Sequence, residues 1–154
     1  VKIKSNHVSS KKGVVLVLDD VNDPGNMGTI IRVCDWFGIS NIICSNDTVD
    51  LYNPKVIQSS MGSIFRVNVI YTDLLKYLQG VDSPIYGAYM NGEDVKNISF
   101  SKNLHLVMGN ESKGISENLA HLISNKVRIN NIGESAESLN VAVASSILLY
   151  EICN

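Results

Sequence analysis

The stretch VVLVLDDVNDPGNMGTIIRVCDWFG, residues 14–38, contains a strand and a helix in succession and sets the fold class. Its first five residues form a continuous apolar run, which is typical of a strand that helices cover on both faces. Turn-forming residues follow at 23–26, and Asn26 is a candidate helix cap. Beyond the turn, apolar residues recur at helical spacing and form an expected core stripe of Ile30, Val33, Cys34 and Phe37. Gly28, Arg32 and Asp35 fall on the opposite side of this expected helix.

Apolar runs and helix-like periodic stretches alternate over the rest of the chain, which is typical of the α/β class. We therefore expect a mostly parallel sheet with helices on both faces. The expected strands are 14–18, 41–44, 65–70, 85–89, 104–108 and 126–129. The further expected helices are 54–60, 72–79, 116–124 and about 140–152.

The last expected helix, 140–152, leaves no wide polar face, so it should be buried nearly all round. A helix at the end of a chain is seldom so enclosed. Small residues at 142 and 144–146 would let another backbone approach closely. We expect an interface with a second subunit to supply the missing cover.

Length and composition indicate one domain of 154 residues with a genuine core. Residues 1–13 are expected to be an N-terminal tail or linker remnant, and residues 14–154 the domain itself. Charged residues make up 18% of the chain, against about 25% in typical domains, and the net charge is −2. This balance argues against a wholly basic nucleic-acid-binding domain, although a local basic patch would not change it much.

Three cysteines, at 34, 44 and 153, form no CxxC pair, so neither a disulfide framework nor a zinc site is indicated. No apolar run is long enough to span a membrane, and residues 1–4 lack the apolar stretch of a signal peptide. We expect a soluble protein in a reducing cytoplasm, with no metal and no membrane partner.

Three polar clusters follow expected strands: residues 22–28 with Arg32, residues 109–114, and residues 129–140. Ligands of open α/β sheets bind beyond the carboxyl ends of the strands, so each cluster is a candidate site. The second is neither a P-loop nor a GxGxxG pattern. Each cluster also has a structural interpretation, namely a turn with a solvated arginine, a glycine turn, and a cap of the last helix by Ser138 or Asn140.

Taken together, the clusters resemble three motifs of the TrmH-type (SpoU) family of RNA ribose 2′-O-methyltransferases, in the SPOUT superfamily. The first motif, Asn-x-Gly-x-x-x-Arg, matches Asn26, Gly28 and Arg32. The second, Gly-x-Glu-x-x-Gly, matches Gly109, Glu111 and Gly114. The third matches Ser138, Leu139, Asn140 and Val141. One departure is the sequence Asn130-Asn131, where the family usually has proline followed by methionine or arginine.

The resemblance implies a deep trefoil knot at the C-terminus, a homodimer, and S-adenosylmethionine as cofactor. It implies that backbone groups of a few segments hold the cofactor. The implied cofactor-binding residues are Ala88, Tyr89, Met90 and Asn91, Met108, Gly109, Gly114, Ile129, Ser138 and Leu139.

The implied reaction is transfer of a methyl group to a ribose 2′-hydroxyl in tRNA or rRNA. Arg32 is the implied catalytic residue, and Asn26, Glu111, Ser138 and Asn140 are expected to orient it and the ribose. Candidate RNA contacts at positions 66, 113, 126 and 128 lie close to the motifs. Lys2, Lys4, Lys11 and Lys12 form either a solvated tail or an RNA-binding arm.

Two other functions remain open at this point. One is a non-catalytic knotted dimer that binds cofactor or RNA. The other is a regulatory α/β domain that binds ATP or NAD in preference to S-adenosylmethionine. A cofactor titration combined with a methyl-transfer assay separates all three.

Overall fold

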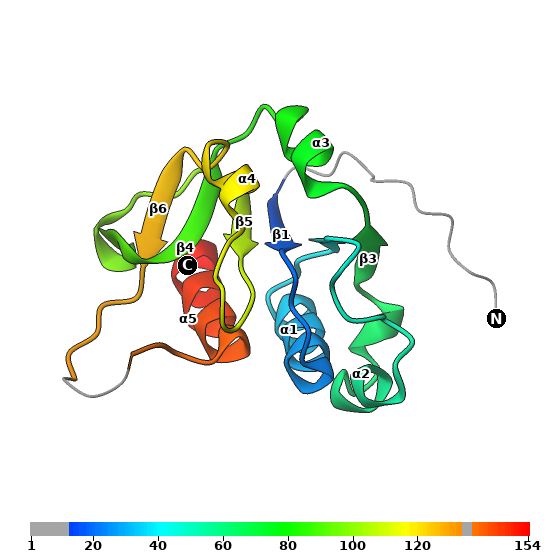
Figure 1. Ribbon diagram of the computed structural model, residues 1–154. Helices are drawn as coiled ribbons and strands as arrows, with labels where there is room; N and C mark the ends of the chain where they lie inside the picture. Colours follow the sequence, from blue (N-terminus) through cyan, green and yellow to red (C-terminus); the bar gives the residue numbers. More distant parts are fainter. Residues whose placement is uncertain (1–12, 134–136) are drawn as a thin grey trace.

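The computed structural model describes residues 13–133 and 137–154, and contains a six-stranded sheet in the order β3-β2-β1-β5-β4-β6 (Figure 1). All five strand pairings are parallel. The α/β prediction with a mostly parallel sheet is therefore confirmed. The strands are β1 (Val14–Leu18), β2 (Asn41–Cys44), β3 (Asn68–Tyr71), β4 (Ile85–Asp94), β5 (Leu104–Met108) and β6 (Asn125–Arg128).

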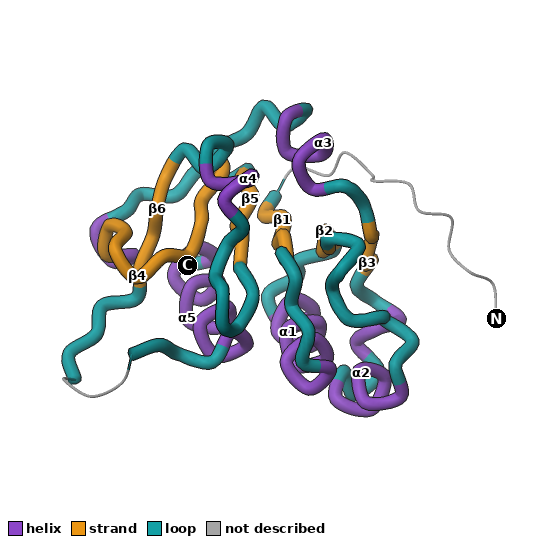
Figure 2. The backbone as a smooth tube through the Cα atoms, in the orientation of Figure 1, coloured by secondary structure: helices purple, strands orange, loops and turns teal. Residues whose placement is uncertain are grey.

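Helices cover both faces of the sheet, as expected (Figure 2). One apolar core lies under α1 (Pro24–Trp36), α2 (Pro54–Ser59) and α5 (Val141–Cys153), with the short 3-10 helix η2 (Val95–Asn97). The other lies under α3 (Leu74–Gln79) and α4 (Glu117–Ala120). Side chains of β1 alternate between the two, because Leu16 and Leu18 enter the first core and Val17 enters the second.

Three predicted elements have clearly different bounds in the structure. The strand expected at 85–89 continues to Asp94 as β4. The strand expected at 65–70 begins only at Asn68, because residues before it form the 3-10 helix η1 (Ser63–Phe65). The helix expected at 116–124 is reduced to the four residues of α4. It ends early because Ser124 joins the sheet, where its backbone N–H donates to the Ile85 carbonyl at 3.0 Å.

The side of α1 that carries Gly28 was expected to face away from the core, and this prediction is wrong for Gly28. The glycine is buried against α2, where an added Cβ would lie 2.8 Å from the Val56 carbonyl oxygen and 2.8 Å from the Ser59 Cβ. Only glycine permits this approach of the two helices. In the expected stripe, Ile30 and Cys34 are fully buried, whereas the other two members are half-buried.

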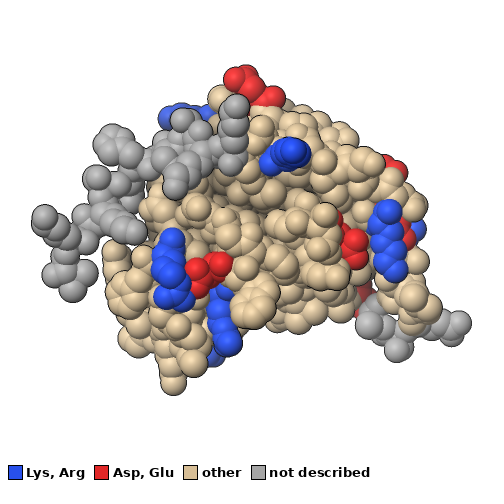
Figure 3. All heavy atoms as spheres, turned by 180° about the vertical axis from the view of Figure 1, so that it is seen from behind, with Lys and Arg blue, Asp and Glu red and all other residues tan. Residues whose placement is uncertain are grey.

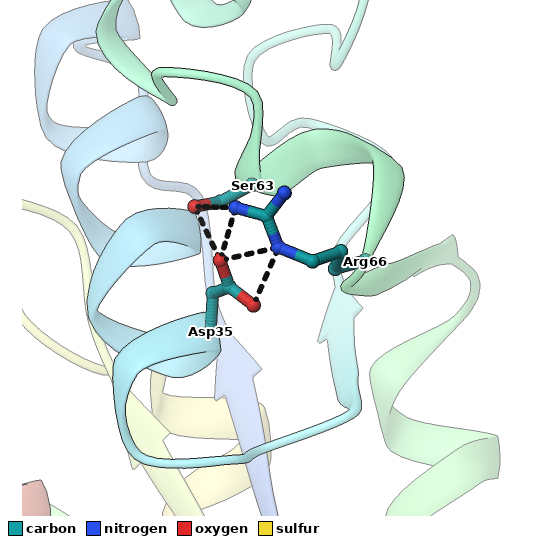
Figure 4. A network of polar contacts seen from close by, with 3 residues as sticks. All are labelled: Asp35, Ser63 and Arg66. Carbon is teal, nitrogen blue, oxygen red and sulfur yellow. Dashed lines mark hydrogen bonds and ion pairs between the residues drawn. The ribbon is translucent and has the colours of Figure 1, made fainter.

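Asp35, on the same side of α1, joins this helix to η1 (Figure 4). Its carboxylate accepts hydrogen bonds from the Arg66 guanidinium at 2.6 and 2.8 Å and from the Ser63 hydroxyl at 2.7 Å. These bonds, that from Arg66 first, hold the pKa of Asp35 below its ordinary value. Arg66 is thus engaged in a structural ion pair, which limits it as an RNA contact.

The helix expected at about 140–152 is α5. Within a single copy of the chain it is buried on one side only, not on all sides as expected. Its buried side includes Val141, Ser145 and Leu148, whereas Val143 is 47% exposed and Tyr150 is 56% exposed. Within the described residues, no helix is long and apolar enough to cross a bilayer.

One buried histidine lies away from the polar clusters. His105 of β5 bonds through one ring nitrogen to the Tyr77 hydroxyl at 2.9 Å and through the other to the Ser83 hydroxyl at 2.8 Å. Burial lowers the pKa of His105 from 6.5 to about 4. The imidazole is therefore neutral near pH 7.

Candidate functional site

The first two polar clusters meet because β1 and β5 are parallel neighbours with Leu18 opposite Met108. The chain leaves both strands at the same edge of the sheet, and the Asp19 N–H donates to the Met108 carbonyl at 2.9 Å. The loop before α1 therefore lies beside residues 109–114. This juxtaposition follows from the strand order, which places β5 next to β1.

Glu111 is the acceptor that joins these two loops. Its carboxylate accepts from the Asn26 side-chain amide at 3.1 Å and from the backbone N–H groups of Asp23 at 3.2 Å and Asn22 at 3.4 Å. Burial acts to raise the pKa of Glu111, but these bonds and one from its own N–H outweigh it and lower the pKa. Glu111 is therefore an ionised acceptor that orders the loop.

Asn140 brings the third cluster to the same place. Its side-chain amide donates to Asn26 Oδ1 at 2.8 Å, and its own Oδ1 accepts from the N–H groups of Ala142 and Val143. Asn140 thus caps α5 and also extends the chain of bonds from Glu111 through Asn26. In the structure, Asn140 therefore caps α5 and also takes part in the hydrogen-bond network of the candidate site.

A cavity of about 410 Å³ lies beside this network, between the ends of β4, β5 and β6 and the start of α5. Glu111, Asn130 and Asn131 are among the residues that line it. The implied cofactor-binding residues that also line it are Ala88, Tyr89, Met90, Met108, Gly109, Gly114, Ile129, Ser138 and Leu139. One cavity therefore gathers residues from four separate segments.

The wall contributed by β4 is an irregular part of the sheet. Val127 of β6 is in register with both Ala88 and Glu93, so the residues between these two bulge away from β6. Such a bulge leaves backbone donors and acceptors out of the ladder. Residues 89–91 of the expected cofactor segment fall on it, and an interrupted ladder of this kind suits a ligand held by main-chain hydrogen bonds.

The wall contributed by residues 109–114 is a tight loop. Asn110 and Gly114 exchange two backbone hydrogen bonds of 3.0 Å, and Gly114 has a φ of +71°. A Cβ on Gly109 would lie 2.5 Å from the Gly114 carbonyl oxygen. Each glycine of the second motif is thus required by the backbone, Gly109 by the close approach of residue 114 and Gly114 by its positive φ. The tight loop that they permit forms one wall of the cavity.

Two residues that the sequence analysis did not single out hold this loop in place. Asn110 donates its side-chain amide to the Asp20 backbone carbonyl at 2.7 Å and to the Asp20 carboxylate at 3.2 Å. Asp20 has a φ of +58°, which is costly for a residue with a side chain. The available signal for the pair was that each residue is the second one after an expected strand end.

A second cavity, of about 480 Å³, lies on the other side of Asn110 and includes Asp19, Asp47 and Asp73 in its lining. Asp19 accepts hydrogen bonds from the backbone N–H and the hydroxyl of Ser116. Across 13–133 and 137–154, no group of three His, Cys, Asp or Glu side chains is placed to hold a metal ion.

Comparison with known proteins identifies the family. The sequence pattern of the SpoU rRNA Methylase family matches residues 13–150. The chain belongs to this family. A 23S rRNA (guanosine(2553)-2′-O)-methyltransferase from Bacillus subtilis is 36% identical over 142 residues, which cover 90% of this chain and 57% of that protein. The resemblance drawn from the three motifs is thereby confirmed.

Solved structures of SpoU and TrmH proteins have the same fold. A putative TrmH-family RNA methyltransferase from Porphyromonas gingivalis has a TM-score of 0.85 at 39% identity, over 92% of this chain and 59% of its own. An AdoMet-bound rRNA methyltransferase from Sinorhizobium meliloti has a TM-score of 0.85 at 34% identity, over 91% of this chain and 55% of its own. The chain spans less than two thirds of the length of each of these relatives.

In this SpoU-family chain, Arg32 lies apart from the network. It is exposed, six residues after Asn26 and about 120° further around α1. It forms no hydrogen bond or ion pair with any residue that the structure describes, and it does not line the cavity. Ser138 lines the cavity but makes no hydrogen bond within the described residues. The structure thus gathers Asn26, Glu111 and Asn140, and leaves Arg32 facing solvent.

Proposed function

We propose that residues 14–154 form the catalytic domain of an S-adenosylmethionine-dependent RNA ribose 2′-O-methyltransferase. The observation that carries this proposal is the cavity at the strand ends, directly beside the Glu111–Asn26–Asn140 network. Family membership and the names of the relatives support the same activity. Because the chain spans about half of those relatives, the activity is proposed for this domain and the RNA substrate, tRNA or rRNA, is left as a class.

The residues present fit the proposed cofactor. The pairing of β4 with β6 is interrupted between Ala88 and Glu93 in the cavity wall, and two buried donors of lining residues, Tyr89 OH and Arg128 Nε, have no partner among the described residues. Apolar side chains such as Met108 and Leu139 complete the lining. When bound, S-adenosylmethionine supplies a methyl group on a sulfonium, ready for in-line displacement.

The residues of the chain would then align and activate the ribose hydroxyl. A hydroxyl is a poor nucleophile, so its position and the removal of its proton control the rate. Because a guanidinium is always protonated, we assign Arg32 as a clamp on the adjacent phosphate that also stabilises developing alkoxide charge. The proton passes to solvent or phosphate. Asn26, Glu111, Ser138 and Asn140 are assigned to positioning.

A homodimer is part of this proposal. Val143 and Tyr150 of α5 and Trp36 of α1 are exposed, the last by 85%, and α1 and α5 pack side by side. On the face seen from behind, charged side chains stand in a few separate groups with uncharged surface between them (Figure 3). A second copy that packs on α1 and α5 would cover their exposed apolar residues, and we propose that Arg32 of α1 acts across that interface.

The knot is likewise proposed. β6 lies at one edge of the sheet, whereas α5, the next helix, packs on α1 near the middle. The chain therefore passes from the edge of the sheet to its middle between β6 and α5, and we propose that it does so as a threaded C-terminal segment. A crystal structure of the chain, traced through residues 129–141, tests this path directly.

We propose the cytoplasm as the compartment. Cys34 and Cys44 are buried free thiols whose pKa values burial raises, and Cys153 is a free exposed thiol. Free thiols and an RNA substrate both suit a reducing compartment.

The decisive experiment measures transfer of a labelled methyl group from S-adenosylmethionine to bulk RNA, followed by identification of 2′-O-methyl nucleosides. Arg32→Ala should abolish transfer while S-adenosylhomocysteine still binds, and Lys55→Ala, which removes an exposed cation of α2, should retain it. Arg32→Ala with normal turnover overturns the role of Arg32.

The same experiment separates the other two functions. Cofactor binding without transfer by the unaltered chain supports a non-catalytic knotted dimer. Preferential binding of ATP or NAD supports a regulatory nucleotide-binding domain. Salt dependence adds a check on the RNA contacts, because affinity that depends on phosphate contacts falls steeply as salt rises.

A further inference from the structure

Two buried donors on residues that line the cavity have no hydrogen-bond partner among the described residues. They are the Nε atom of Arg128 and the hydroxyl of Tyr89, and both residues line the cavity. A buried donor without a partner costs roughly 1–3 kcal/mol, so native proteins rarely leave one in place without a reason. A ligand that accepts hydrogen bonds at this point would supply that reason.

Arg128 is the last residue of β6, and the fold places it next to the bulge in β4. Val127, directly before it, is in register with Ala88, the last β4 residue before the bulge. Tyr89 and Arg128 therefore follow paired positions on neighbouring strands. Both residues thus belong to the part of the cavity wall where the pairing of β4 with β6 is interrupted.

Two carboxylates on elements near Arg128 are engaged elsewhere, and no ion pair joins Arg128 to Glu93, which pairs with Val127. Asp94 is in register with Arg128, but its carboxylate accepts from the Lys96 N–H at 3.1 Å and caps η2. Glu111, on the opposite wall, accepts from three donors of the loop before α1. Within the described residues, Arg128 is thus a half-buried cation without a counter-ion.

A guanidinium in this setting selects a planar anion that accepts two parallel hydrogen bonds, which is the geometry of a carboxylate. We infer that Arg128 binds the carboxylate of the methionine part of S-adenosylmethionine, with the Tyr89 hydroxyl as a second donor at that end. This inference rests on the proposed function, and it assigns a side-chain contact to one end of a ligand otherwise held by backbone groups. An RNA phosphate is the other anion that could reach a cation near the site, and the experiment separates the two.

The test is calorimetric binding of two ligands to the full chain. S-adenosylhomocysteine carries the carboxylate, whereas 5′-methylthioadenosine has the same adenosine and thioether but no amino-acid group. Arg128→Gln should weaken S-adenosylhomocysteine by about 10- to 100-fold, the range for a lost charged hydrogen bond. It should change 5′-methylthioadenosine by less than about twofold.

Matched variants separate the contact from general charge or folding effects. Lys102→Gln removes an exposed cation before β5 that does not line the cavity. It should leave both affinities within about twofold. Arg128→Lys keeps the charge without the planar fork and should recover only part of the loss. Tyr89→Phe should weaken S-adenosylhomocysteine alone, by about two- to tenfold.

The outcomes distinguish failure of the Arg128–carboxylate contact from failure of the proposed methyltransferase function. Equal weakening of both ligands by Arg128→Gln, or no weakening of either, overturns the carboxylate contact while the proposed function stands. Loss of RNA affinity with unchanged S-adenosylhomocysteine affinity assigns Arg128 to phosphate and also overturns it. If the unaltered chain binds neither ligand, the proposed function and the inference fail together.

Discussion

Replacement of Gly109 by alanine is expected to destabilise the protein by about 3 kcal/mol. The added Cβ would lie 2.5 Å from the Gly114 carbonyl oxygen and closer still to two further backbone atoms of residues 114 and 115. Ordinary contact needs more than 3.4 Å, so the facing backbone must move by about 1 Å. Overpacking of this kind costs roughly 1–3 kcal/mol. The movement also threatens the two Asn110–Gly114 bonds, each worth about 1 kcal/mol.

Gly114→Ala is the matched control, because it adds the same methyl group to the same loop. Nothing lies within 4 Å of a Cβ at this position, so the only penalty is the φ of +71°, about 1–2 kcal/mol. The assay is the urea midpoint of each variant at one fixed protein concentration, with the slope of the transition as a check. Gly109→Ala should be the less stable of the two. A Gly109→Ala midpoint within about 0.5 kcal/mol of the unaltered chain, or a costlier Gly114→Ala, would refute the steric argument.

Three further predictions concern other parts of the fold. Asn140→Asp keeps the oxygen that caps α5 but removes the amide that donates to Asn26. Methyl transfer should therefore fall at least about tenfold with little change in the urea midpoint. Asn140→Ala removes the cap as well and should also lower the free energy of unfolding by about 1 kcal/mol. Because the pKa of His105 is lowered in the folded protein, the unfolded chain binds more protons than the folded one between pH 6.5 and about 4. The free energy of unfolding should therefore fall by up to about 3 kcal/mol as pH drops through this window. His105→Gln should make the urea midpoint less dependent on pH over the same range. Gly28→Ala should lower the free energy of unfolding, measured by heat or urea, by about 1–3 kcal/mol. Adding Ser59→Ala should restore only part of that loss, because the new methyl group at position 28 would still lie 2.8 Å from the Val56 carbonyl oxygen of α2.

Much of the architecture could be predicted because local pattern and tertiary environment agree. The run at 104–108 is apolar throughout, and β5 is buried on both faces at those residues. The clusters after 18 and after 108 were expected at the sheet edge, and parallel pairing of Leu18 with Met108 brings them together. Such agreement holds wherever an element's environment is set by the period of its own side chains.

Other features depended on neighbours that local sequence does not specify. Gly28 has the pattern of an outward position, yet α2 covers it. The expected helix at 116–124 was cut short because Ser124 bonds to β4. Arg32 belongs to the same motif as Asn26, but their spacing places the two on different sides of α1, so only one of them meets Glu111.

The sequence by itself determined the fold class, the strand and helix order, and the residue types that the site contains. These follow from side-chain periodicity, turn chemistry and motif spacing, which are properties of short segments. Only the tertiary structure decided that Asn140 both caps α5 and bonds to Asn26, that Asn110 holds Asp20 in a left-handed conformation, and that Arg128 is left with a buried donor and no partner. The bonds of Asn140 to Asn26 and of Asn110 to Asp20 join residues far apart in sequence, and such bonds exist only once strand order has placed two loops within about 3 Å of each other. The burial of the Arg128 donor likewise depends on the elements that pack around it.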